Sequence, residues 1–325
     1  MKTHHRLLLL AAFLKASLLG SVAAQEGFSF GYDTISFFEK PTAFDVGIGT
    51  LNTNLLIDQS ILYGDSTDDY SAATRFLGLF NFGTQLTNGW QFNAQYLANY
   101  VGFDDDDYRG NLAVSVTDYW GVLAVGQVTG SVFEKTRRQR GAGNASLAFD
   151  QFAGGLKDEG VFYSVRFNSY EFAATVDREG GFELGANFER PIGASSYFGG
   201  LRLRKGETIT GGVSRDTLGG AAVFAYTYAS LTIDSQVGIE SVDSLYSGEN
   251  EHLFSSLGLS YKTGALTVSA EAGISKLADQ TRYSAAFGSR LDLARGLSLN
   301  LGVNYQKTEN SAGDTIARGS LRYEF

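Results

Sequence analysis

The chain of 325 residues contains no cysteine, only two prolines and one methionine, and three histidines. The lack of cysteine excludes a disulfide framework, so stability has to come from burial or from closed hydrogen bonding. Scarce proline suits a chain of many paired strands, because proline cannot donate to a strand ladder. Scarce histidine leaves little material for histidine-based catalysis.

Long apolar runs are also missing after the first residues, so no later segment is a candidate for a membrane-spanning helix. The run Leu7–Leu14 follows a basic start and precedes small residues that end at Ala24. This order predicts a secretory signal peptide, residues 1–24, and a mature chain of residues 25–325. A membrane anchor would need about 20 unbroken apolar residues, and Lys15 interrupts the run.

Charge of one sign dominates the mature chain. Removing residues 1–24 takes away three of the 26 basic residues and no acidic one, leaving 23 against 35, a net charge of −12. For an exported protein this acidity argues against a nucleic-acid partner. Acidic residues gather at Asp65–Asp69 and in a run of four that we interpret as a solvated loop. The alternative is a Ca²⁺ site, the only cofactor considered, although Tyr108 breaks the EF-hand spacing. The run consists of Asp104, Asp105, Asp106 and Asp107.

Glycine and aromatic residues are abundant, with 40 Gly, 17 Tyr and 24 Phe. Runs of about ten residues with a two-residue apolar period recur between turn-type residues, which is typical of a transmembrane β-barrel. Residues 297–305 are apolar at odd positions and polar or glycine at even ones. Residues 90–101 alternate after the tight-turn signal Asn88-Gly89, with Leu97 as an exception. The alternative, a secreted β-sandwich, would need a second layer over each apolar face.

The pattern predicts an all-β, antiparallel barrel of sixteen strands, five before a long loop and eleven after it. An even number is expected if both termini lie on the periplasmic side, and the count is uncertain by about two. We interpret 63–70 as an acidic loop and 205–219 as a second long loop, although ETITGGVS within it resembles a strand. The expected strands are 44–58, 74–87, 90–101, 111–117, 121–128, 160–167, 171–178, 182–190, 196–204, 220–229, 232–242, 252–262, 265–276, 282–292, 297–307 and 315–325.

Thr129–Glu159 is the longest stretch without a strand pattern, and it begins with a basic cluster. A loop of this length is usually functional or disordered, and we expect it to fold into the barrel lumen and narrow a pore. Its candidate constriction residues are Lys135, Arg137, Arg138, Arg140, Asp150, Asp158 and Glu159.

Charged residues of the strands are expected on the inward faces, because each would cost about 2–4 kcal/mol on the lipid face near the midplane. Six arginines join the candidate constriction on this basis, namely Arg166, Arg202, Arg204, Arg290, Arg318 and Arg322. Four acids are expected to point inward as well, namely Glu183, Glu189, Glu271 and Glu324.

The chain ends with Leu321, Tyr323 and Phe325 on one face, and this resembles the closing strand of Gram-negative outer-membrane proteins. Together with WGVLAVGQV before the long loop, it makes the mature chain similar to the general porins, as found in alphaproteobacteria. The resemblance implies an integral outer-membrane protein, a constriction loop at Thr129–Glu159 and a homotrimer.

The function we expect is passive diffusion of small hydrophilic solutes and ions through a water-filled channel, with no enzymatic activity. Opposed charges at the constriction would give weak selectivity that favours dipolar or anionic solutes. Two alternatives stay open. One is a barrel enzyme of phospholipase or protease type, for which His252 beside Glu251 is the candidate base. The other is a structural or adhesin barrel with a plugged lumen.

Overall fold

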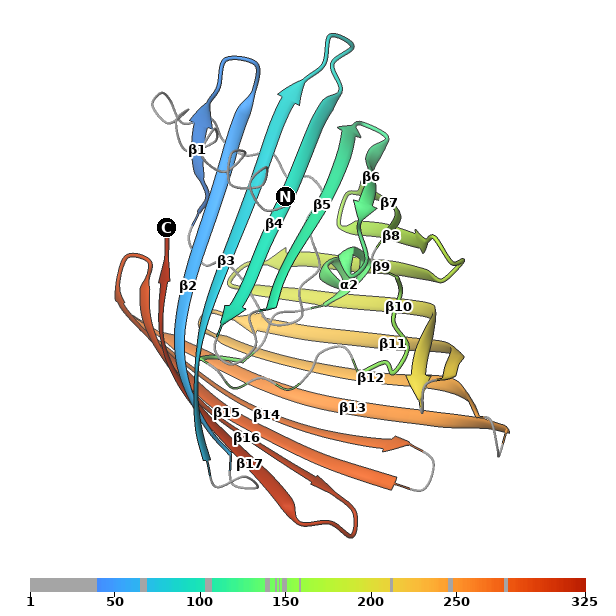
Figure 1. The fold of residues 1–325 in the computed structure, drawn as a ribbon, viewed down its shortest axis with the longest axis vertical. Coiled ribbons are helices and arrows are strands. Elements are labelled where there is room, and N and C mark those ends of the chain that lie inside the picture. Colours follow the sequence, from blue (N-terminus) through green and yellow to red (C-terminus); the bar gives the residue numbers. More distant parts are fainter. Residues whose placement is uncertain are drawn as a thin grey trace, which may run out of the picture.

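The wall of the molecule is a ring of antiparallel strands in which each strand is hydrogen-bonded to the next one in the chain (Figure 1). The last strand is hydrogen-bonded back to β2, so sixteen strands close the ring. The structure is a computed structural model that describes residues 40–64, 69–102, 107–137, 141–143, 145, 147, 151–157, 159–210, 213–244, 248–277 and 280–325. The predicted signal peptide lies outside these residues.

One short helix and seventeen strands make up the described secondary structure, with α2 at Ser131–Thr136. The strands are β1 (Thr42–Asp45), β2 (Thr50–Gly64), β3 (Asp69–Gln85), β4 (Gln91–Gly102), β5 (Asp107–Asp118), β6 (Gly121–Gln127), β7 (Glu159–Phe167), β8 (Tyr170–Asp177), β9 (Phe182–Ile192), β10 (Ser195–Thr210), β11 (Val213–Tyr228), β12 (Leu231–Ser244), β13 (Gly248–Thr263), β14 (Leu266–Leu277), β15 (Gln280–Ala294), β16 (Leu297–Thr308) and β17 (Gly313–Glu324). The predicted barrel is confirmed, with five wall strands before the long loop and eleven after it. Among the described residues, no helix combines the length and apolar character needed to cross a membrane.

Closure takes place along one edge of β2. β17 pairs with Leu56–Gly64, and β1 pairs with Thr50–Thr53 further along the same edge. Between them, the Leu55 amide donates to the Phe325 carbonyl at 2.8 Å and the Phe325 amide donates to the Leu55 carbonyl at 3.0 Å. Phe325 therefore completes the ladder at the point where β17 ends.

The two ends of the barrel differ. At one end, two residues separate β5 from β6, β7 from β8, β9 from β10, β11 from β12, β13 from β14 and β15 from β16. These turns use positive φ angles, as at Gly193 (62°) and Gly264 (56°). Phe325 lies at this tight-turn end, and the long loop leaves from the opposite end. Short turns at one end and longer loops at the other are typical of outer-membrane barrels.

The outer face of the wall is apolar and is bordered by aromatic residues near both ends of the strands. At the tight-turn end the Trp90 and Trp120 rings lie 5.8 Å apart, and at the other end the Tyr63 and Tyr70 rings lie 4.9 Å apart. Two aromatic girdles around an apolar band are the distribution expected where a barrel crosses a bilayer. Further members are Tyr170, Tyr197, Tyr228, Tyr261 and Tyr323 at the tight-turn end, and Tyr100, Tyr108, Tyr283 and Tyr305 at the other.

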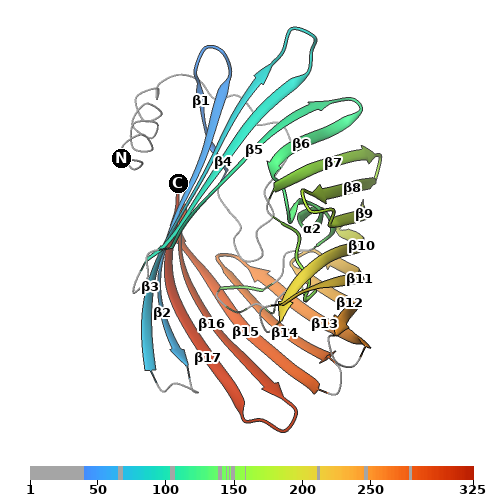
Figure 2. The same cartoon turned by 45° about the vertical axis from the view of Figure 1, so that its right-hand side comes forward.

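Strand length varies around the ring. β6, β7 and β8 have 7, 9 and 8 residues, whereas the other wall strands have 11 to 17. Figure 2 shows these three short strands next to α2. The wall is therefore low on the side where the long loop enters the barrel.

The exception in the alternation, Leu97, has a structural explanation. It projects inward with Leu56 and Leu77, and the three side chains form a cluster in which each is at most 2% exposed. Partly buried Leu79 packs against this cluster. Leucine on an otherwise polar inner face is therefore buried inside the barrel and not directed at lipid.

The predicted second long loop at 205–219 is wrong. β10 continues to Thr210 and β11 begins at Val213, with Glu207 paired to Asp216 and Thr208 paired to Arg215. This part of the hairpin carries polar residues at successive positions, so it lacks the two-residue apolar period that marks the other strands.

The first strand was also placed wrongly, because residues 44–58 are divided between β1 and β2. The Asp45 carboxylate accepts a hydrogen bond from the Gly47 amide at 2.8 Å, and Gly47 has a φ of 82°. This side-chain turn reverses the chain before Thr50. The expected loop 63–70 is also shorter than predicted, since β2 extends to Gly64 and β3 begins at Asp69.

Deleting Phe325 should impair barrel closure, because two backbone hydrogen bonds, each worth about 1 kcal/mol, are lost from the seam. The measurement is the fraction of protein that refolds into the heat-modifiable form seen by gel mobility. Phe325→Tyr keeps the backbone and the ring and is the control. Equal refolding of the truncated and full-length chains would contradict a role for Phe325 in closure.

Candidate pore constriction

The segment between β6 and β7, residues 128–158, is called the inserted loop here. Figure 2 shows its helix, α2, inside the ring. Val128 and Val132 are fully buried against inward-facing residues of β5 to β8, among them Phe162 on β7. Thr136 donates its hydroxyl to the Val132 carbonyl at 2.9 Å. The start of the loop is therefore packed on the inner wall at its low side.

After α2 the loop reaches a different part of the wall. The Ala142 amide donates to Ser269 Oγ on β14 at 2.6 Å, whereas Arg137 lies beside β10. The Leu147 amide donates to Glu271 on the same strand at 2.8 Å. The loop therefore contacts the wall four strands further round the ring than α2 does.

The return arm then follows the wall back toward β7. The Phe152 ring contacts Phe254 on β13 at a centroid distance of 5.4 Å. Gly155 and Glu207 on β10 exchange two backbone hydrogen bonds of 2.9 and 3.0 Å, beyond the point where β9 pairs with β10. The Lys157 amide donates to Asp177 on β8 at 2.8 Å. The described parts of the loop thus lie inside the ring, against β5 to β16.

Glycines of the wall let the loop backbone come this close. A Cβ atom on Gly200 would lie 2.2 Å from the Thr136 carbonyl oxygen, and one on Gly288 would lie 2.0 Å from the Ala142 carbonyl oxygen. Real Cβ atoms do not approach oxygen so closely, so any larger residue would move the loop or the strand. These two glycines mark where the end of α2 and the segment after it rest on the wall.

Wall carboxylates hold the return arm by accepting hydrogen bonds from its backbone. Glu240, which is 1% exposed, accepts from the Ala153 amide at 2.6 Å and from the Gly154 amide at 2.9 Å. Buried Glu271 and Asp177 act in the same way toward Leu147 and Lys157. Hydrogen bonds to an ionised acceptor are roughly twice as strong as neutral ones. Acids that sequence reasoning assigned to the lumen surface, such as Glu271, are therefore used to position the loop.

Arg202 and Arg204, both on β10, also contact the loop. Fully buried Glu183 lies 3.4 Å from Arg202 Nη1 and accepts hydrogen bonds from Arg204 at 3.1 and 3.3 Å. Arg204 donates a further bond to the Gly154 carbonyl at 3.0 Å. Only 4% of the Arg202 side chain and 9% of the Arg204 side chain are exposed. Both point inward as predicted, yet little of either reaches open lumen.

A second group of charges surrounds Glu171, whose carboxylate lies 2.9 Å from Lys135 Nζ of α2 and 3.0 Å from Arg166 Nη2. Arg166 is 57% exposed, and Lys135 is 22% exposed. Arg137 pairs with Glu134 within the same loop. The predicted basic residues Lys135 and Arg166 are therefore brought together, on the low side of the barrel, by an acid that sequence reasoning did not single out.

The remaining predicted arginines lie on β15 and β17, and β17 is eight strands from β9 around the ring, which places it on the opposite side of the lumen. Arg318 is 31% exposed, donates to Ser60 at 3.2 Å and lies 3.6 Å from Asp58. Arg322 lies 2.7 Å from Glu324, and Arg290 lies 2.7 Å from Asp292. Basic groups are thus paired with acidic groups on both sides of the lumen.

Arg138, Arg140, Asp150 and Asp158 lie outside the described residues, so their part in the constriction stays a prediction. Glu159 is placed differently from the prediction. It alternates with inward-facing Gly160, Phe162 and Ser164, and it pairs with Arg178 at 3.1 Å, both side chains being 62% exposed. Its carboxylate is therefore at the rim of the outer face and not in the lumen. Glu189 lies on the inward face of β9, two positions beyond Asn187.

Among the described residues, neither the metal alternative nor the enzyme alternative gains a site. Asp104, Asp105 and Asp106 lie outside the described residues, and Asp107 begins β5. Within the part of the chain that is described, no group of three or more His, Cys, Asp or Glu side chains is arranged to hold a metal ion. His252 faces Glu240, with its Nδ1 3.6 Å from the carboxylate, and successive strand positions put Glu251 on the other face. The acid that faces the candidate base His252 is therefore Glu240, and its sequence neighbour Glu251 lies on the opposite face.

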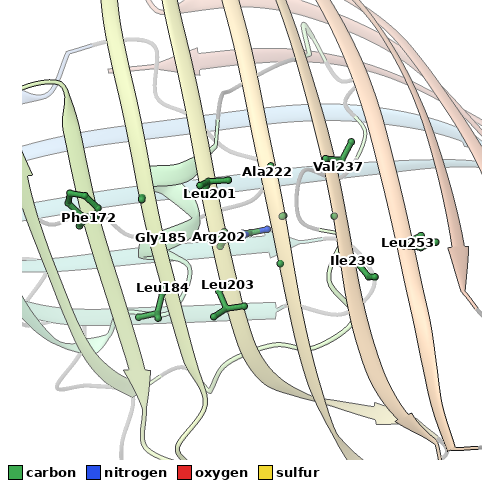
Figure 3. Close-up of a pocket in the computed structure, with 14 residues that line it drawn as sticks. Phe172, Leu184, Gly185, Leu201, Arg202, Leu203, Ala222, Val237, Ile239 and Leu253 are labelled. Atoms are coloured by element: carbon green, nitrogen blue, oxygen red, sulfur yellow. The ribbon is translucent and has the colours of Figure 1, made fainter.

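The outer wall opposite this loop-covered region carries a shallow apolar depression of about 830 Å³. Figure 3 shows it across β8 to β13, with Leu201, Arg202 and Leu203 in succession on β10. Leu201 is 62% exposed on this outer face, whereas the Arg202 guanidinium lies with Glu183 on the inner one. The alternation along one strand thus separates the apolar surface from the charged interior.

The comparisons with known proteins agree with this architecture. No protein-family model matches the sequence, and no curated protein matches it. The anion-selective porin of Comamonas acidovorans is similar in structure, with 15% identity, a TM-score of 0.68, and coverage of 85% of this chain and 100% of that one. A loop-deletion variant of OmpT, an outer membrane protein of Vibrio cholerae, has 14% identity, a TM-score of 0.66, and coverage of 86% and 100%. A mutant of the Rh. blastica porin has 16% identity, a TM-score of 0.56, and coverage of 85% and 100%. At these identities the likeness establishes the fold, a porin-type barrel of sixteen strands.

Gly200→Ala should displace α2 from the wall, because the new Cβ would overlap the Thr136 carbonyl, and overpacking of this kind costs about 1–3 kcal/mol. Gly199→Ala is a matched control, since a Cβ on this adjacent glycine meets nothing within 4 Å. The measurement is thermal stability of the folded barrel in detergent. A Gly200→Ala barrel as stable as the Gly199→Ala barrel would show that α2 does not rest on Gly200.

Proposed function

We propose that this protein is a diffusion porin, an outer-membrane channel for small hydrophilic solutes and ions. One observation supports this above the others, namely a loop that lies inside a closed sixteen-stranded barrel and is fastened to its inner wall. The lumen of a barrel of this size is aqueous unless something fills it, so a loop held against the wall narrows the passage. The apolar band and two aromatic girdles support an outer-membrane location, and the signal sequence supports export.

The proposed solutes are ions and small dipolar or anionic molecules. Arg166 and Arg318 lie on opposite sides of the lumen and are the more exposed of the predicted wall arginines, and each is paired with a carboxylate. Mixed charges of both signs favour weak selectivity, and exposed guanidinium groups favour anionic or dipolar solutes over bulky apolar ones.

We further propose a homotrimer that uses the low wall as part of its contact surface. A strand needs about 9–11 residues to cross the hydrocarbon region, and β6 and β8 have 7 and 8. A neighbouring copy would shield this side from lipid. The test is the molecular mass of the detergent-solubilised assembly, which should be that of three chains. The mass of a single chain would contradict the proposed trimer.

Reconstitution in planar bilayers should give stepwise, ohmic conductance, and deletion of Ser131–Gly155 should raise the conductance of each step. The reason is that the deletion removes most of the inserted loop, which connects β6 to β7 and whose described residues lie inside the barrel. Heat-modifiable mobility of the deletion variant provides the folding control. A silent wild-type barrel would favour the plugged alternative, and equal conductance of folded deletion and wild-type channels would mean that the loop does not limit the pore.

Replacing Arg137, Arg138 and Arg140 together with Gln should shift the reversal potential in a salt gradient toward cations, because three positive charges leave the loop. Fields inside a narrow lumen are screened less than those at an exposed surface, where salt acts within about 8 Å. Arg178→Gln, which removes a rim charge paired with Glu159, is the control and should leave the potential nearly unchanged. If the reversal potential of the triple variant is unshifted, the assignment of the basic cluster to the constriction is wrong.

A further inference from the structure

Two arginines that the sequence places in the lumen are stacked against aromatic residues of the inserted loop. Phe133 belongs to α2, at the start of the loop, and Phe152 belongs to the return arm. The Arg202 guanidinium carbon lies 4.5 Å from the Phe133 ring centre and 4.8 Å from the Phe152 ring centre. One wall side chain therefore contacts both arms of the loop at once.

The stack extends on both sides of Arg202. The Arg137 guanidinium carbon lies 4.9 Å from the centre of the Phe133 ring. The Arg204 guanidinium carbon lies 5.2 Å from the centre of the Phe152 ring. Arginine and phenylalanine thus alternate in the order Arg137, Phe133, Arg202, Phe152, Arg204. Stacking of a guanidinium on an aromatic face is favourable, and more so where water is excluded.

Charge balance in the cluster comes from the wall. Glu183 is 0% exposed and contacts both wall arginines, while Arg137 is paired with Glu134. The space left between α2 and β10 beside Arg137 and Arg202 amounts to about 10 Å³, which is at most one water molecule. Only 4% of the Arg202 side chain is exposed, so little of it is accessible to a solute in the lumen.

We propose that Arg202 is a positioning residue, which holds both arms of the inserted loop on β10 and so sets the width of the pore, and that it contributes little to charge selectivity. The statements about pore width and charge selectivity rest on the proposed porin function, whereas the positioning of the loop by Arg202 does not. Arg318 provides the contrast, because it is an inward arginine on the opposite side of the ring and 31% exposed. The two residues should have separable effects.

The test uses the absence of native cysteine. Single reporters are placed at Val132→Cys in the first arm and at Leu147→Cys at the start of the return arm, where the native side chains are 0% and 6% exposed. The rate at which a water-soluble maleimide labels each reporter measures how often that arm leaves the wall. Breaking a buried charge contact should raise both labelling rates by a factor on the order of 100 in Arg202→Met. Arg318→Met should leave both rates unchanged.

Reversal potentials give the second readout. Arg318→Met should shift the potential toward cations, and Arg202→Lys, which keeps the charge but loses the planar stack, should leave it in place while raising both labelling rates. Phe152→Leu keeps the wall and the Arg202–Phe133 contact intact and should raise the rate at Leu147 alone, so it serves if Arg202→Met does not fold. Labelling rates that stay at the wild-type value in Arg202→Lys and Phe152→Leu would overturn the proposal. A raised rate at only one of the two reporters in Arg202→Lys would overturn it as well. A wild-type channel without conductance would overturn the porin function and leave the labelling test valid.

Discussion

Closure of the hydrogen-bonded ring is the constraint on which the rest of the molecule depends. In a bilayer no water is present to satisfy the backbone of an edge strand, so a sheet can cross only if its last strand pairs with its first. Here that pairing is the seam between β17 and β2, the one wall contact between strands far apart in the sequence. The remaining wall pairings join neighbours in the chain, and all of them except β6 with β7 do so through short connections. A local, repetitive construction is therefore made stable by one distant contact.

The inserted loop depends on the wall in turn, because a segment of its length has too few internal contacts to hold a shape alone. Its backbone amides donate hydrogen bonds to side chains of three wall strands, namely Asp177 on β8, Glu240 on β12, and Ser269 and Glu271 on β14. The shape of the lumen is thus determined by side chains of the barrel as much as by those of the loop.

Much of the wall was predictable from the sequence, and the reason is physical. A strand with lipid on one side and water on the other must alternate, so the strands of residues 265–307 were located within a few positions. Where strands extend beyond the apolar band, both faces meet water and nothing requires the residues to alternate. The sequence pattern therefore failed to predict the end of the β10–β11 hairpin around Thr210 and Val213. The six residues of α2 are too few to show a helical period. The inward direction of Arg202 followed from alternation, but its burial under Phe133 and Phe152 depends on the path of the loop, which no local pattern encodes.

The glycines beneath the loop have a consequence for the thickness of what lies inside the barrel. Sheets separated by a full layer of side chains pack about 10 Å apart, whereas hydrogen-bonded backbones lie about 4.8 Å apart. Where Gly200 and Gly288 meet loop carbonyls directly, the intervening layer is absent and the loop occupies less of the barrel's internal diameter. A ring of fixed circumference can then hold an extra stretch of chain while less of its interior is filled. The glycine positions of the wall therefore help to determine how much of the lumen the loop takes up.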